Sequence, residues 1–160
     1  MPPVLTAIAD RVHFAQTGLV NWTLVTGDGG MVHRSDDDGA TWEVVHSGGG
    51  RLLGLHVRES GREVLLYGDQ LVRFDGRSFE TLDNPGRAPL CAMTELDGVL
   101  VLVGDSGQLF FSEGGTDWTS PRLEISADLE SVDQVADGIL AVGSGGTVLF
   151  SEDGRGWSQV

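Results

Sequence analysis

The chain reads Val101-Leu102-Val103-Gly104-Asp105-Ser106-Gly107 past its midpoint, and related stretches occur at 23–30, 65–69 and 140–146. In each copy an apolar run ends at a glycine, and a short β-rich run, a polar turn and an aromatic residue follow. The glycines are Gly27, Gly68, Gly104 and Gly143, and the aromatics are Trp42, Phe79, Trp118 and Trp157. Because both series advance in steps of 36 to 41 residues, the sequence predicts four structural repeats.

Each repeat divides into four strand-like pieces. In the third repeat these pieces are 90–96, 99–103, 108–111 and 118–122, separated by turns rich in Gly, Asp and Ser. The piece 99–103 is apolar at every position, whereas a strand with one solvated face alternates apolar and polar residues. It is therefore expected to be covered on both faces, as happens when four-stranded sheets stack on one another.

The predicted fold is all-β: a small β-propeller of four four-stranded blades, forming a single domain over 1–160. The same repeats also fit a half-ring that dimerises into an eight-bladed propeller. Residues 1–10 precede the first predicted blade and are interpreted as an extra N-terminal strand or arm. The blades are expected at about 11–46, 51–83, 88–122 and 126–160.

The turn between the third and fourth strands carries a recognisable motif in three repeats. The first copy, Ser35-Asp36-Asp37-Asp38-Gly39-Ala40-Thr41-Trp42, fits the Asp-box pattern S-x-D-x-G-x-T-W at every fixed position. The copies at 112–118 and 151–157 are one residue shorter and keep Ser, Gly and Trp. The chain thus resembles BNR/Asp-box repeat β-propellers, particularly the photosystem II assembly/stability-factor-like repeats. This resemblance implies the fold rather than the function, because the box recurs in enzymes, receptors, assembly factors and phage proteins.

The Asp boxes are interpreted as structural elements that fold a hairpin. Ser and Asp side chains accept backbone N–H groups, Gly takes the left-handed backbone conformation, and Trp is expected to fill the space between blades. The residues assigned to this role are Ser35, Asp37, Gly39, Thr41, Trp42, Ser112, Gly115, Trp118, Ser151, Asp153, Gly154 and Trp157.

Three aspartates form the candidate binding site. Asp28, Asp69 and Asp105 each follow a repeat glycine at the turn between the second and third strands, so they are expected to ring one end of the propeller. The sharper hypothesis is an acidic rim that binds a cation or an arginine, since propellers often recognise partners through such loops. The plainer alternative is that each aspartate only forms its turn.

Catalytic and metal-binding patterns do not emerge from the sequence. A sialidase needs a tyrosine nucleophile, but the only tyrosine, Tyr67, stands in an apolar strand. No pair of histidines has metal-ligand spacing, and no nucleophile elbow is present. Cys91, the only cysteine, reads as an inert residue of a buried strand. The prediction is therefore a protein that is not an enzyme and that holds neither a metal nor a cofactor.

The charge of the chain restricts its partners. It has 24 acidic residues and 10 basic residues, all of them arginine, which gives a formal net charge of −14. Such a surface disfavours nucleic acid and anionic membranes as partners. The leading hypothesis is a non-catalytic interaction, structural or assembly module that binds protein partners, in a larger assembly or as a homo-oligomer. A phage virion or tail component is one setting, so the expected location is cytoplasm or virion; a carbohydrate-binding propeller is the alternative.

Overall fold

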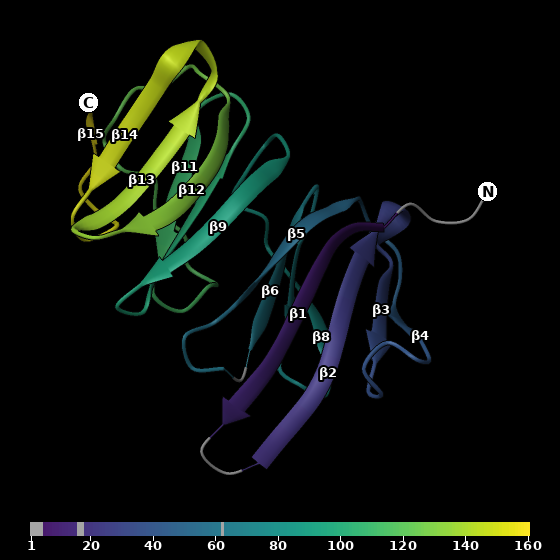
Figure 1. Ribbon diagram of the computed structural model, residues 1–160. Helices are drawn as coiled ribbons and strands as arrows, with labels where there is room; N and C mark the ends of the chain where they lie inside the picture. Colours follow the sequence, from purple (N-terminus) through teal and green to yellow (C-terminus); the bar gives the residue numbers. More distant parts are fainter. Residues whose placement is uncertain (1–4, 16–17, 62) are drawn as a thin grey trace. The chain divides into compact units, whose positions relative to one another are not determined.

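The computed structural model describes the backbone of residues 5–15, 18–61 and 63–160, and the side chains of 22–61 and 63–160. These residues form antiparallel strands joined by short turns, with single 3₁₀ turns at Asp28–Gly30 and Ser144–Gly146 (Figure 1). The chain divides into two compact units, 1–82 and 83–160. Each unit contains two sheets, and within every sheet each strand pairs with the next strand along the chain.

The first unit holds two four-stranded sheets. Their strands are β1 (Leu5–Ala15), β2 (Gly18–Gly27), β3 (Val32–Ser35) and β4 (Glu43–His46), then β5 (Leu52–Val57), β6 (Val64–Gly68), β7 (Leu71–Phe74) and β8 (Phe79–Leu82). The second unit begins with β9 (Leu90–Leu96), β10 (Val99–Gly104) and β11 (Gln108–Ser112). It ends with β12 (Leu129–Val135), β13 (Gly138–Gly143), β14 (Thr147–Ser151) and β15 (Ser158–Gln159). The prediction of an all-β chain built from propeller blades is confirmed.

Two predicted strand boundaries differ from the structure. The predicted fourth strand at 118–122 is reduced to one bridge between Phe111 and Thr119, because Pro121 follows and has no N–H to continue the ladder. Residues 5–10 form the first half of β1 and pair with β2, so they are not a separate arm. Residues 1–4 lie outside the described part, and a single domain, its blade limits and ring closure stay predictions.

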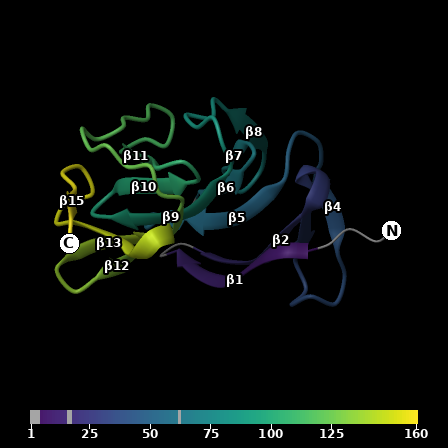
Figure 2. The ribbon, with the colours of Figure 1, turned by 90° about the horizontal axis from the view of Figure 1, so that it is seen from above.

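Within each unit, two sheets pack face to face around an apolar core (Figures 1 and 2). In the first unit, Leu24 and Val32 of the first sheet belong to one buried cluster with Val64 and Leu66 of the second. A second cluster joins β10 to β12, β13 and β14 in the same way. All six residues of β10 are buried, as its unbroken apolar run predicts.

The repeat glycines are explained by a close approach of two backbones. A Cβ added to Gly68, Gly104 or Gly143 would lie 2.4, 2.3 or 2.2 Å from a backbone carbonyl oxygen. In each case this oxygen belongs to the residue just before the first strand of the same sheet. The next residue in each copy donates its N–H to that same carbonyl, at 2.8 to 3.2 Å. The second strand therefore ends in glycine because any side chain would break this contact.

Replacing Gly104 with alanine is expected to destabilise the protein by about 1–3 kcal/mol, the usual cost of forcing extra atoms into a packed site. Gly114→Ala is the matched control, because a Cβ there meets nothing nearer than 3.6 Å. Urea denaturation followed by tryptophan fluorescence measures both changes. Equal stability of the two variants would contradict the close-approach explanation.

Candidate functional site

The first Asp box is a hydrogen-bonded turn. The Ser35 hydroxyl accepts the N–H of Gly39 at 2.8 Å and donates to Asp37 at 2.8 Å. Asp37 in turn accepts the hydroxyl and the N–H of Thr41, at 2.5 and 2.8 Å. These bonds, the Thr41 hydroxyl above all, hold the pKa of Asp37 below its usual value. The side chains of Ser35, Asp37 and Thr41 are thus used inside the turn.

The two shorter boxes keep the same core. Ser112 accepts the N–H of Gly115 at 2.9 Å, and Ser151 accepts the N–H of Gly154 at 2.8 Å. Asp153 adds bonds from the N–H groups of Gly156 and Arg155, which lower the pKa of this carboxyl. The second sheet lacks the motif and uses Asp75, which accepts the N–H groups of Arg77 and Ser78. Sequence reasoning missed Asp75, although it follows Phe74 at the position after the missing serine.

The tryptophans of the boxes differ in how they pack: Trp157 packs against the core cluster shared by the two sheets of its unit, whereas the ring of Trp42 does not fill the space between sheets. Trp42 is 43% exposed, and Trp118 and Trp157 are only half-buried. Each indole N–H donates to the carbonyl of the box glycine, at 3.0 to 3.1 Å. This bond keeps each ring beside its own turn. Of the three, Trp42 stays available for external contacts.

The predicted acidic rim is distributed over both units, and two of its members have partners inside the protein. Asp28, in the first unit, is exposed. Asp69, in the same unit, accepts the Arg51 guanidinium at 3.0 and 3.2 Å, which lowers the pKa of this carboxyl. Asp105, in the second unit, accepts the Cys91 thiol at 3.4 Å. A shared cation-binding rim stays a prediction, while a role in joining strands is observed for Asp69 and Asp105.

Two glutamines beside these turns were missed by the sequence analysis. The Gln70 amide donates to the carbonyls of Gly48 and Gly50, in the loop between the two sheets of the first unit. Gln108 accepts the N–H of Arg87 and donates to the carbonyl of Ala88 in the loop before β9. Both glutamines directly precede the leucine that begins, or nearly begins, the third strand. The repeated Gln-Leu pair at the start of the third strand was the sequence signal that could have identified these two glutamines.

The last sheet presents an apolar face that the other sheet of its unit does not cover. In each unit, one face of the first sheet packs against the second sheet. We call this face, and the equivalent face of any other sheet, the forward face. On β10 and β11 it contains Val101, Val103 and Leu109, which are buried against the last sheet. The register gives Leu140 and Val142 the equivalent places on β13. The apolar members of the forward face of the last sheet are Val135, Leu140, Val142, Val148 and Phe150, and the register places Ser131, Asp133 and Ser158 on the same face.

Part of this forward face is exposed to solvent. Val142 is 42% exposed and Val135 is 40% exposed, and the other three members are half-buried. By contrast, Val101 and Val103 at the equivalent places on β10 are fully buried. Exposed apolar side chains bordered by polar ones, here Ser131 and Asp133, are typical of an interaction site.

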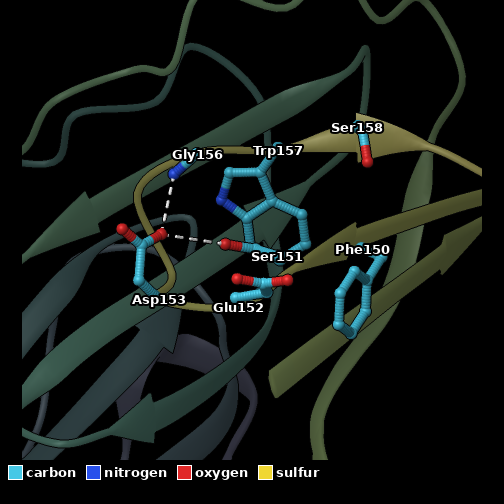
Figure 3. Close-up of a pocket in the computed structure, with 7 residues that line it drawn as sticks. All are labelled: Phe150, Ser151, Glu152, Asp153, Gly156, Trp157 and Ser158. Carbon is cyan, nitrogen blue, oxygen red and sulfur yellow. Dashed lines mark hydrogen bonds between the residues drawn. The ribbon is translucent and has the colours of Figure 1, made fainter. Parts of the chain in front are cut away.

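A hollow of about 450 Å³ lies at the end of this face, beside the fourth Asp box (Figure 3). Two aromatic rings, Phe150 and Trp157, contribute to its wall together with the carboxylate of Glu152. The rest of the lining is Ser151, Asp153, Gly156 and Ser158. The hollow thus combines aromatic faces with negative charge.

Among the residues that the structure describes, no three His, Cys, Asp or Glu side chains are grouped so that they could hold a metal ion. Within the same part of the chain, no helix has the length and apolar character needed to cross a membrane.

Cys91 is expected to react slowly with iodoacetamide. Burial, together with the hydrogen bond to Asp105, raises the pKa of its thiol from 9.0 to about 11. The thiolate fraction at pH 8 should then be roughly a hundredfold below that of a cysteine peptide. Asp105→Asn should speed the reaction, because it removes the negative charge that disfavours the thiolate.

Mass spectrometry of the alkylated protein measures these rates, with the exposed Asp117→Asn as the matched control. A wild-type rate equal to that of the peptide, or no acceleration by Asp105→Asn, would contradict this assignment.

Comparison with known proteins shows the fold. YCF48 from Cyanidioschyzon merolae is 20% identical with a TM-score of 0.67, over 99% of this chain and 57% of that one. YCF48 bound to D1 peptide is 21% identical with a TM-score of 0.63, over 89% and 50%. A GH74 enzyme from Niastella koreensis is 19% identical with a TM-score of 0.63, over 98% and 24%. The chain spans about half the length of the two YCF48 structures. No protein-family model and no curated protein sequence matches it. These likenesses are to β-propellers, and the Asp-box family itself stays a hypothesis.

Proposed function

We propose that this chain is a non-catalytic protein-interaction module, which binds a segment of a partner protein on the forward face of its last sheet. The observation that carries the proposal is the solvent exposure of Val135 and Val142 on that face. We infer the kind of segment that binds there from the neighbouring third sheet, because the forward face of that sheet is covered by another β-sheet. A β-rich segment of the partner would extend the same stacking by one layer.

The energy available on this surface suits a specific contact. Burying a whole valine or leucine side chain stabilises a contact by roughly 1.5–3 kcal/mol. Burying the exposed part of a half-exposed valine would therefore contribute about 1 kcal/mol. Five such side chains would give a useful driving force before the cost of association is subtracted. Hydrogen bonds to the edge of the sheet would add to it, because the edge strand β15 is only two residues long.

The charge favours a basic partner. The second unit carries thirteen acidic residues and three arginines, a formal net charge of −10, against −4 for eleven acidic residues and seven arginines in the first unit. This asymmetry would steer a cationic segment toward the second unit. One YCF48 structure is described as bound to a D1 peptide, which supports peptide binding by this kind of fold. A phage particle as the setting, and a homo-oligomer as the assembly, stay predictions from the sequence.

Val142→Asp should weaken binding of a partner peptide at least about tenfold, because a charge would be buried in the apolar contact. Peptides selected from a phage-displayed library against the whole chain provide the ligands, and isothermal titration calorimetry gives their affinities. Val44→Asp, at an exposed valine on β4 in the first unit, is the matched control and should leave binding unchanged.

Two outcomes would contradict the proposal. In one, selection yields no peptides that bind above an unrelated scaffold. In the other, the selected peptides bind wild type and Val142→Asp equally well. A glycan array that gave sugar ligands where selection gave no peptides would favour the carbohydrate-binding alternative.

A further inference from the structure

We infer that Glu152, with the aromatic hollow beside it, is a binding site for an arginine side chain of the partner protein. This inference rests on the proposed function and specifies the chemistry of the segment that binds there. It is carried by a comparison of the same position in the three Asp boxes.

In two of the three Asp boxes, the acidic residue after the serine already holds an arginine. Asp36 accepts the guanidinium of Arg34 in the first box, at 2.7 and 2.9 Å. Glu113 accepts the guanidinium of Arg155 in the third box, at 2.5 Å. The equivalent residue in the fourth box is Glu152. It makes no hydrogen bond or ion pair with any residue that the structure describes.

The source of the arginine depends on the residue that precedes the serine. In the first sheet this residue is Arg34 itself. The second sheet has no Asp box; Arg73 stands at the matching place and pairs with Glu80 and Glu63. The third sheet has Phe111 there, so it cannot supply its own cation. The sheet that covers its forward face supplies one instead, through Arg155.

The fourth sheet repeats the arrangement of the third. Its sequence Phe150-Ser151-Glu152 matches Phe111-Ser112-Glu113 residue for residue. The third sheet obtains its arginine from the layer stacked on it. If the last sheet is covered in the same way, the segment that covers it would bring an arginine to Glu152.

The hollow has the chemistry to receive it. A planar guanidinium stacks on an aromatic ring and forms paired hydrogen bonds with a carboxylate, whereas a lysine ammonium does neither as well. Phe150 and Trp157 provide the rings, and Glu152 provides the carboxylate. Arginine is therefore favoured over lysine, and a charged peptide over a neutral sugar.

The arginine is assigned to a different protein rather than to a second copy of this chain. Each copy carries a formal net charge of −14, so two copies repel one another. A basic partner is attracted by the same negative charge.

The test uses two blocked hexapeptides, Val-Thr-Val-Arg-Val-Thr and the same peptide with neutral citrulline in place of arginine. Binding is followed in the intact chain by the NMR signal of the Trp157 indole N–H, which is assigned by its loss in Trp157→Phe. The arginine peptide should shift this signal and bind about tenfold more tightly than the citrulline peptide. Glu152→Gln should remove that difference, and Glu130→Gln, an exposed change of equal charge on β12, should keep it.

Each contrary result has a distinct meaning. If the arginine peptide leaves the indole signal unmoved, the arginine site is overturned, whatever the library selection gives. If both hexapeptides bind equally and Val142→Asp weakens both, the arginine site is overturned while the proposed function stands. A shift caused by methyl glycosides but not by arginine would replace the site with a sugar site. Dimerisation of the chain that Glu152→Gln abolishes would assign the arginine to a second copy.

Discussion

The structure depends on one requirement: the forward face of a sheet must be covered by another layer. Four-stranded sheets this small cannot bury enough apolar surface alone, so the two sheets of each unit share one core. Leu24 is fully buried because the second sheet lies over it, and Val101 is fully buried because the last sheet lies over it. The requirement then applies to the last sheet as well, where Val142 stays exposed. The proposed function follows from that difference.

Much of the fold could be predicted because backbone geometry restricts the sequence. Gly68, Gly104 and Gly143 recur because each lies against a carbonyl of a neighbouring strand, where any side chain would collide. The unbroken apolar run of β10 signalled burial at every position, which the structure has. The serines of the Asp boxes were assigned to turns, and Ser35 and Ser151 do accept the expected N–H groups.

The candidate site was harder to predict, because it depends on which faces are left uncovered. Sequence periodicity gives Val103 and Val142 the same place in the repeat, yet only one is buried. The exposed indole of Trp42 was also unexpected, since the motif does not reveal that the ring bonds to its own turn. Nothing in the sequence distinguishes Glu152 from other turn residues; the partners of Asp36 and Glu113 in the structure single it out.

The charge of the second unit and the shape of its exposed apolar face both contribute to the selection of a partner. Its net charge of −10 attracts a basic segment over a distance of about one Debye length, and the apolar face then selects for a close fit. The proposed function requires that the forward face of the last sheet is exposed to solvent in the unbound protein. Methyl NMR with a soluble paramagnetic probe tests it most directly. The account predicts strong broadening of the Val142 methyl signals and little effect on Val103. Equal protection of the two valines in a monomer would contradict it.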